Sequence, residues 1–243
     1  MNRQLLLEYL RQRTELGDHE LYLDNLTASE FIRAINAPAL STAPAVDLPL
    51  APSQARPIAL QSLTVLANQA SACTACALHA TRRNAVFARG NSTSPVMVVG
   101  EAPGEEEDKT GLPFVGRAGK LLDVLLASIG FPRDSVYICN VLKCRPPSNR
   151  NPLPNEIESC SGFLSSQIDI IAPKVLLAVG KFAAQTLVQS EESIGRLRGQ
   201  IHKYRDVPVV VTYHPAYLLR SPQATRIAWN DFQLLRTILD EQT

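Results

Sequence analysis

Residues 95–104 read PVMVVGEAPG, a short apolar run that ends in a glycine-rich turn. Three further apolar runs follow it, at residues 136–142, 175–179 and 207–213. Each run is short, rich in valine and apolar nearly throughout, which is typical of strands that are buried on both faces of a parallel sheet. The pattern that begins at residue 95 therefore predicts an α/β fold.

Helical patterns separate these runs and complete the prediction. They cover residues 118–129, 154–171, 181–189 and 227–239, and the second of them begins with a proline at its first turn. Strands that alternate with helices predict a three-layer α/β/α fold with a mainly parallel central sheet. In such sheets ligands bind beyond the carboxyl ends of the strands. The segments GEAPG, CNVLKCRPP and YHPAYLLR each end or follow a predicted strand, so we expect them to converge on one cleft.

Composition divides the 243-residue chain into three parts. Residues 1–36 read as a helical segment, 37–60 as a flexible linker with five prolines, and 61–243 as the main domain. With 45% hydrophobic and 19% charged residues, the chain is not disordered as a whole, and its net charge of +1 excludes a globally basic protein. The chain has no run that approaches the roughly 18 apolar residues of a membrane span, and its first residues lack a signal-peptide pattern.

Four of the five cysteines have a spacing that suits a metal or a cluster. Cys73 and Cys76 form a C-x2-C pair, and Cys144 and Cys160 follow far downstream, whereas Cys139 lies in an apolar run and reads as a buried free thiol. In a chain without a targeting signal, ligation outranks disulfide formation. Four thiolates suit zinc or a [4Fe–4S] cluster, and the spacing does not separate the two. His79 is a further zinc ligand candidate, although a surface histidine is the simpler interpretation.

The glycine-rich stretch 100–119 follows the first predicted strand. It lacks the Gly-Lys-Ser/Thr sequence of a phosphate-binding loop, so that interpretation fails. Glu101 is expected at the cleft mouth, where a carboxylate is able to orient a water molecule. The acidic run 105–108 reads as a solvated turn, with a divalent cation site of a nuclease as the alternative. Phe114 is either a core residue or a platform on which a base stacks.

Two further polar residues lie at predicted strand ends. The Asn140 amide is able to donate and accept at once, which suits either the edge of a base or the capping of a loop. His214 precedes a proline that keeps it extended, and alone it fits a structural role as well as a catalytic one. Between residues 196 and 220 five basic residues accompany one aspartate, a local excess that suits either a phosphate backbone or an exposed helix edge.

Taken together, these segments resemble the family 4 uracil-DNA glycosylases, which are iron–sulfur members of the uracil-DNA glycosylase superfamily. The resemblance rests on GEAPG (100–104), LPFVG (112–116), NVLKCRPP (140–147) and HPAYLLR (214–220), in the order in which the family has them. It covers roughly residues 70–240, and residues 1–60 lie outside the family's core. A related branch that traps DNA covalently has a histidine in an insertion after the second cleft motif. Residues 145–152 contain no histidine, which favours ordinary turnover.

The resemblance implies a DNA repair hydrolase that flips uracil out of DNA, cleaves its N-glycosidic bond and leaves an abasic site. It implies a [4Fe–4S] cluster held by Cys73, Cys76, Cys144 and Cys160. The residues that it implies for the uracil pocket are Gly100, Glu101, Ala102, Phe114, Asn140 and His214. Within that set, Glu101 and His214 would be catalytic, Phe114 would stack on the base, and Asn140 would read its edge. The residues that it implies for DNA contact are Pro215, Leu218 and Arg220.

Two other classes of protein remain as alternatives. A non-catalytic iron–sulfur DNA-binding module associated with replication or repair would keep the cysteines but would not need Glu101, Asn140 and His214 together. A nuclease would depend on a divalent cation at residues 105–108. For the glycosylase we expect uracil-containing DNA, single- or double-stranded, as the partner, a monomeric state, and a cytoplasmic location with the nucleoid. The N-terminal segment is expected to serve a protein partner, and no membrane is involved.

Overall fold

The computed structural model describes the chain from Ala55 to Gln242, and its side chains from Leu63 onward. The predicted helical segment 1–36 and most of the predicted linker 37–60 therefore lie outside the described residues. Helix α3 (Ala55–Ala72) begins within that linker, so residues 55–60 of the predicted linker are helical. The division of the chain into segments otherwise stays a prediction.

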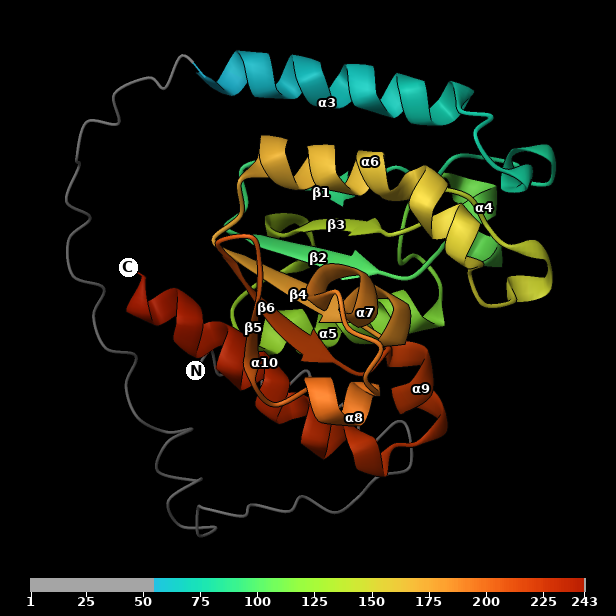
Figure 1. Cartoon of the computed structure of the whole chain (residues 1–243). Helices are drawn as coiled ribbons and strands as arrows, with labels where there is room; N and C mark the ends of the chain where they lie inside the picture. The colour runs from blue at the N-terminus through green and yellow to red at the C-terminus, as the bar shows by residue number, and fades with distance from the viewer. Residues whose placement is uncertain (1–54, 243) are drawn as a thin grey trace, which may run out of the picture. The chain divides into compact units, whose positions relative to one another are not determined.

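One six-stranded sheet forms the centre of the fold, with the strand order β1-β3-β2-β4-β6-β5 (Figure 1). Its strands are β1 (Arg89–Gly90), β2 (Val96–Gly100), β3 (Tyr137–Asn140), β4 (Val175–Val179), β5 (Ile201–Tyr204) and β6 (Val207–Thr212). The four central strands run parallel, and the two edge strands β1 and β5 pair antiparallel with their neighbours. The sheet is therefore mainly parallel, as predicted.

Helices cover both faces of this sheet. On one face lie α3, α6 (Pro154–Ile171), α7 (Lys181–Val188) and α8 (Ile194–Leu197), whose buried side chains form one apolar core. On the other face α5 (Arg117–Ser128), α9 (Pro215–Arg220) and α10 (Gln223–Glu241) form a second core. Figure 1 shows α3 and α6 on one side of the strands and α5 and α10 on the other. This arrangement confirms the predicted three-layer α/β/α fold.

The four apolar runs became the four parallel strands because strands inside a covered sheet bury both faces. Every residue of β2, β3 and β4 is buried. The edge strand β5 has only exposed and half-buried residues and reads IHKY, so its sequence carries no apolar signal. The short helices also escaped prediction: α4 (Glu105–Thr110) lies inside the glycine-rich stretch, and α9 begins at the proline of the His-Pro pair.

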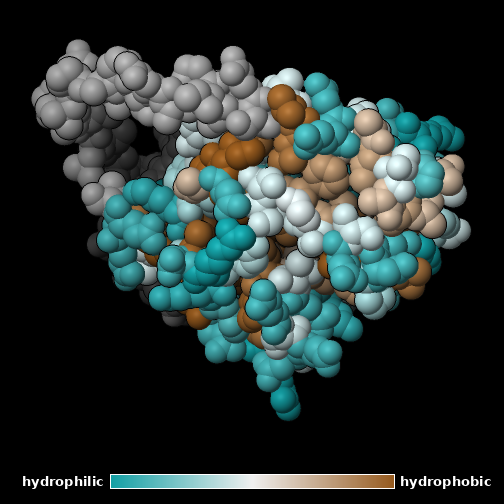
Figure 2. Space-filling model, turned by 45° about the horizontal axis from the view of Figure 1, so that its top comes forward, coloured by the Kyte–Doolittle hydropathy of each residue, from teal (hydrophilic) through white to brown (hydrophobic). Residues whose placement is uncertain are grey.

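Figure 2 is turned so that the top of Figure 1, where α3 and α6 lie, comes forward. Hydrophilic residues cover most of this view, and smaller groups of hydrophobic residues lie between them. Within residues 55–242, no helix combines the length and the apolar composition that crossing a bilayer requires.

Candidate functional site

The carboxyl ends of the parallel strands bring the three predicted cleft segments to one edge of the sheet. Gly100 and Asn140 are register partners at the ends of β2 and β3. On the other side of β2, Val179 of β4 is the register partner of Thr212 of β6. His214 lies two residues beyond Thr212 and so reaches the same edge. The topology therefore assembles a site where ligands of such sheets bind.

Four of the predicted residues meet in this site. A β-carbon placed on Gly100 would lie 2.4 Å from Asn140 Oδ1 and 2.5 Å from Phe114 Cζ. The Phe114 ring in turn stacks on the His214 ring, with 5.9 Å between the ring centroids and 30° between the ring planes. Asn140 is 2% exposed, and its Oδ1 has no hydrogen-bond partner among the described residues. An unpaired buried carbonyl oxygen is costly, so a ligand that donates a hydrogen bond fits there.

Phe114 is held in an unusual backbone conformation. Its φ of 54° lies in the left-handed region, which costs free energy for a residue with a β-carbon. The Arg89 guanidinium donates from Nε to the Pro113 carbonyl at 2.9 Å, which fixes the preceding peptide. The Phe114 carbonyl packs against the backbone of Gly119, where a β-carbon would lie 1.9 Å from the carbonyl oxygen and would exclude this contact. Phe114 is both part of the core and part of the wall of the site, so the two alternatives from sequence are not exclusive.

The acidic run is only half solvated, which corrects the prediction of a solvated turn. Glu107 accepts the amide hydrogens of Val115 and Gly116 at 2.9 and 3.0 Å, and Asp108, 3% exposed, accepts that of Arg83 at 2.9 Å.

Only Glu105 and Glu106 are exposed, and both pair with Lys109. All four carboxylates of the run thus have protein partners, and within residues 55–242 no group of three or more potential ligands is arranged around one metal ion. Loop bracing, rather than cation binding, explains the run.

Glu101 follows Gly100 at the site's edge and is half-buried. Its main-chain carbonyl accepts the Leu142 amide hydrogen at 3.0 Å, which ties the residue to the segment after β3. Desolvation by burial raises the pKa of the Glu101 carboxyl above its usual value of 4.5. In its ionised form this carboxylate is able to act as a base or to supply a negative charge.

His214 caps helix α9 and is held in one tautomer. Its Nδ1 accepts the Ala216 amide hydrogen at 3.2 Å, so in the neutral ring the proton lies on Nε2. Burial, with the Arg220 charge as a second cause, lowers the pKa of His214 to about 4. The ring is therefore neutral near pH 7 and presents an N–H donor.

Gly180 is a site residue that the sequence analysis missed. It follows β4 with φ of 95°, and a β-carbon on it would lie 3.1 Å from the His214 Cβ. Close packing of a backbone against the imidazole fixes the ring on that side. A glycine directly after a buried parallel strand is the sequence signal that could have indicated it.

Helix α9 places the predicted DNA-contact residues in different environments. Leu218 is 2% exposed and belongs to the core beneath the sheet, so its side chain does not reach the surface. Pro215 is buried as well, at the first turn of the helix. The neighbouring Tyr217 and Leu219 are each 41% exposed, and Arg220 is exposed. An amphipathic helix exposes only one side, which the linear motif could not indicate.

The local excess of basic residues does not form one patch either. Arg198 makes a two-point ion pair with the buried Asp231, at 2.8 and 3.1 Å. Arg205 pairs with Asp169 on the outside of α6. These two guanidinium groups stabilise the fold, and Arg220 is the member of the group that lies beside His214.

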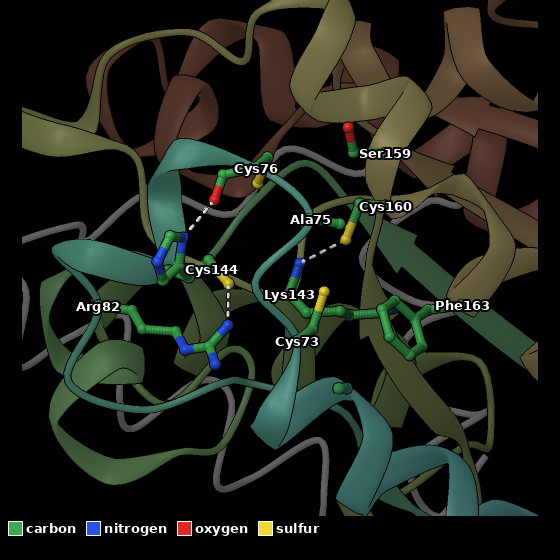
Figure 3. A pocket seen from close by; sticks show the side chains of 11 residues that line it. Cys73, Ala75, Cys76, Arg82, Lys143, Cys144, Ser159, Cys160 and Phe163 are labelled. Carbon is green, nitrogen blue, oxygen red and sulfur yellow. Dashed lines mark hydrogen bonds between the residues drawn. The ribbon is translucent and has the colours of Figure 1, made fainter.

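The four predicted ligand cysteines line one pocket at the end of α3 and α6. Figure 3 shows Cys73, Cys76, Cys144 and Cys160 around the same space. Two nitrogen donors point at their sulfur atoms: Arg82 Nη1 lies 3.1 Å from Cys144 Sγ, and the Lys143 amide nitrogen lies 3.4 Å from Cys160 Sγ. Cys139 lies elsewhere, fully buried in the strand β3, as predicted for a free thiol.

Four thiols around one pocket are a donor set that suits either a zinc ion or an iron–sulfur cluster. Within the described residues no group of three or more potential ligands is arranged around one metal ion. His79 lines the same pocket, but its Nδ1 hydrogen-bonds the Cys76 carbonyl at 2.7 Å.

Comparison with known proteins finds similarity to uracil-DNA glycosylases. A family model of the uracil DNA glycosylase superfamily matches residues 87–233. A type-4 uracil-DNA glycosylase of Thermotoga maritima is 45% identical over 184 residues, which cover 74% of this chain and 96% of the relative. The type-4 uracil-DNA glycosylase of Archaeoglobus fulgidus is 42% identical over 182 residues, with 72% and 92% covered. That of Sulfurisphaera tokodaii is 42% identical over 188 residues, with 74% and 86% covered.

Proposed function

The chain belongs to the uracil-DNA glycosylase superfamily, and we propose that it hydrolyses the N-glycosidic bond of uracil in DNA and leaves an abasic site. The observation that carries this proposal is the unpartnered, buried Oδ1 of Asn140 in a site walled by Gly100, Phe114 and His214. The base must leave the stack to reach such a site, which costs a few kcal/mol.

Asn140 reads the edge of the base. Uracil presents an N3–H donor beside an O4 acceptor, and a side-chain amide answers both groups. Oδ1 accepts from N3–H while the amide nitrogen donates to O4. Cytosine reverses this donor and acceptor order, and each mismatch of buried polar groups costs about 1–3 kcal/mol. Because Gly100 has no side chain, Asn140 and Phe114 pack directly against its backbone, and Phe114 stacks on the face of the base.

Cleavage leaves negative charge on the uracil ring and positive charge on the sugar. The neutral His214 donates its Nε2–H to uracil O2, and the main-chain amide of Ala102 is the second donor that we assign. Glu101 holds the attacking water, and its carboxylate favours the cationic sugar. The motif PPSNRNP at 146–152 contains no histidine that would attack the sugar, so the enzyme turns over without a covalent intermediate.

We assign a [4Fe–4S] cluster to Cys73, Cys76, Cys144 and Cys160. The shared pocket and the two N–H donors toward sulfur support this assignment. The pocket opens next to residues 140–144, which connect it to the base site, and the cluster's contribution there is to hold this segment and the end of α3 together. No redox step enters the reaction.

DNA lies along the edge that α9 presents. Tyr217 and Leu219 supply exposed apolar side chains for the groove, and Arg220 supplies a phosphate contact, with Pro215 as a rigid support beneath them. The substrate is uracil-containing DNA, and its location with the nucleoid in the cytoplasm follows from that substrate. We further propose that the enzyme acts as a monomer and that residues 1–60 serve a protein partner.

The test is excision itself. Purified protein is incubated with an oligonucleotide that contains one uracil, and alkali then breaks the strand at any abasic site. We expect strand breakage at uracil alone, and we expect it to persist when a chelator removes divalent cations. Glu101→Gln should lose most of this excision activity. A non-catalytic DNA-binding module would give binding without breakage, and a nuclease would require the divalent cation.

A further inference from the structure

A buried lysine lies between the base site and the thiol pocket, and no role has yet been given to it. Lys143 is 1% exposed. Its ammonium donates to the Asn140 main-chain carbonyl at 2.6 Å and to Gln167 Oε1 at 2.6 Å. Within residues 55–242 no carboxylate forms an ion pair with it. The Cys139 thiol also interacts with this amino group. A buried amino group that contacts two fixed oxygen atoms and a thiol is held in one position.

The main chain of Lys143 is fixed on both sides. Its amide hydrogen points at Cys160 Sγ at 3.4 Å, and its carbonyl accepts the Val86 amide hydrogen at 2.7 Å. The side chain therefore starts from a rigid point at the edge of the thiol pocket, where Figure 3 labels it. From there it reaches back three residues to Asn140.

The second partner of the ammonium is itself immobile. Gln167 is fully buried, and its Nε2 donates to the Tyr137 hydroxyl at 2.9 Å and to the Phe87 carbonyl at 3.2 Å. Both polar ends of the Gln167 amide are thus occupied, which sets the position of the ammonium. The Phe87 ring lies 5.9 Å below the charge.

We infer that Lys143 is a positioning residue for base recognition: by holding the Asn140 carbonyl, it fixes the backbone from which the unpartnered Asn140 Oδ1 is presented to uracil. The inference rests on the proposed function and deepens it. Lys143 does not touch the base, so it acts through Asn140.

A double-mutant cycle tests this action through Asn140. Lys143→Met removes the donor and keeps an unbranched chain of similar length. We expect it to lower the single-turnover rate of uracil excision by about tenfold or more in the wild-type background, and by less than about threefold in an Asn140→Ala background. Equal effects in both backgrounds would overturn the inference, because they would show that Lys143 acts independently of Asn140.

A binding measurement gives a readout that does not depend on turnover. The probe is an oligonucleotide with one 2′-fluoro-2′-deoxyuridine, whose electron-withdrawing fluorine resists cleavage, and the reference is the same strand with thymidine. We expect Lys143→Met to reduce the preference for the fluorinated uridine in the wild-type background and to leave it unchanged in Asn140→Ala. An undiminished preference in Lys143→Met contradicts the inference.

Tyr137→Phe is the matched control. It removes the other end of the same buried network, next to Gln167, without touching Asn140. It should lower the unfolding temperature and keep the iron content, and it should reduce excision rate and base preference much less than Lys143→Met does, because the Phe87 carbonyl still holds Gln167. A loss of preference equal to that in Lys143→Met would show general loosening of the core and overturn the proposal.

The design separates this inference from the proposed function. If the wild-type protein excises no uracil, the proposed function fails and the inference fails with it. If the wild type excises uracil and the cycle is additive, only the inference fails. Should Lys143→Met not fold, Lys143→Gln replaces it, since its side chain is shorter and carries no amino group. If that variant also unfolds or loses its iron, Lys143 is a structural support and the inference is wrong.

Discussion

Gly100 and Asn140 face each other as register partners on the parallel strands β2 and β3, and a β-carbon on Gly100 would lie 2.4 Å from Asn140 Oδ1. The same β-carbon would lie 2.5 Å from Phe114 Cζ. Because Gly100 has no side chain, Asn140 and Phe114 pack directly against its backbone, which fixes the positions of both side chains. Both residues come from buried strands, which leaves them little freedom to move apart.

Gly100→Ala is therefore expected to abolish most of the excision activity. The methyl group occupies the space between Asn140 and Phe114, and overpacking in a rigid site costs about 1–3 kcal/mol. The measurement is the single-turnover rate on a uracil oligonucleotide, together with the unfolding temperature. As a control, Gly162→Ala in helix α6 has no atom within 4 Å of the new methyl group and should stabilise the protein by about 0.5–1 kcal/mol without a change in rate. Near-normal excision by Gly100→Ala would place the base elsewhere.

Asn140→Asp tests base selectivity. The substitution replaces the amide donor with an acceptor, so the contact to uracil O4 is lost while the shape is kept. We expect uracil excision to fall by more than about tenfold, which corresponds to one mismatch of about 1.4 kcal/mol or more, and the ratio of uracil to cytosine excision to narrow. The rates on paired oligonucleotides with each base provide the comparison. Unchanged excision and selectivity would reduce Asn140 to a loop cap.

Acidic pH should reduce activity through Glu101 before it affects His214. The carboxylate is the active form of Glu101. Because burial raises the pKa of this carboxyl above 4.5, the excision rate declines as the pH falls through the raised pKa. His214, with a pKa of about 4, stays neutral over this range and charges only at lower pH. In Glu101→Gln the remaining activity should lack the decline that Glu101 causes and should fall only near pH 4, where His214 becomes charged. An acid limb that persists unchanged in this variant would exclude Glu101 as its origin.

The lowered pKa of His214 also makes the stability of the protein depend on pH. Its pKa in the folded protein lies below the ordinary 6.5, so the unfolded chain binds more protons between pH 6.5 and 4. The contribution of His214 to the free energy of unfolding is complete above pH 6.5 and is lost as the pH falls to about 4. Relative to His214→Gln, the free energy of unfolding should decline over this window by at most about 1.4 kcal/mol per pH unit. Denaturant unfolding of both proteins across that range measures the difference.

Neighbouring leucines in α9 are expected to separate folding from DNA contact. Leu218→Ala removes a buried core side chain and should cost about 2–5 kcal/mol of stability. Leu219→Ala changes an exposed residue and should leave stability within about 0.5 kcal/mol while it weakens binding to uracil-containing duplex. Thermal unfolding and binding isotherms for both variants decide this. The reverse result, with binding lost only in Leu218→Ala at unchanged stability, would restore Leu218 as the residue that enters the groove.

Cysteine variants should sort cluster ligands from the buried thiol. Cys144→Ser lies in the shared pocket and should lower both the iron content and the broad visible absorption of anaerobically purified protein, where about four irons per chain are expected. Cys139→Ala is the control, because this thiol is fully buried in β3 and should not affect iron. Stoichiometric zinc without iron in fresh wild-type protein would overturn the cluster assignment.

The parallel core of this protein was predictable from sequence because strands that are buried on both faces have continuous apolar sequences. Strands β2, β3 and β4 are apolar at nearly every position, and proline or glycine marks the helix boundaries around them. The rule that ligands bind beyond the carboxyl ends of such strands then placed Gly100, Asn140 and His214 together before any coordinates were known.

Side-chain direction was not predictable in the same way. The motif HPAYLLR contains two adjacent leucines, and only the packing of α9 against the sheet buries Leu218 and exposes Leu219. Likewise, the acidic run is uniform in sequence, yet Glu107 and Asp108 turn inward to accept main-chain amides while their neighbours face water. Local sequence sets the period of a helix, but the surface that it meets sets which side is buried.

Relationships between distant residues required the tertiary structure altogether. The pairing of Lys143 with Gln167, the contact of Gly180 with His214 and the ion pair of Arg198 with Asp231 join different elements. Sequence determined which chemical groups this protein possesses and at which strand ends they lie, because those features follow from local pattern. Which groups are paired, buried or left free for a ligand was decided only by packing, since a partner is defined by distance in space and not along the chain.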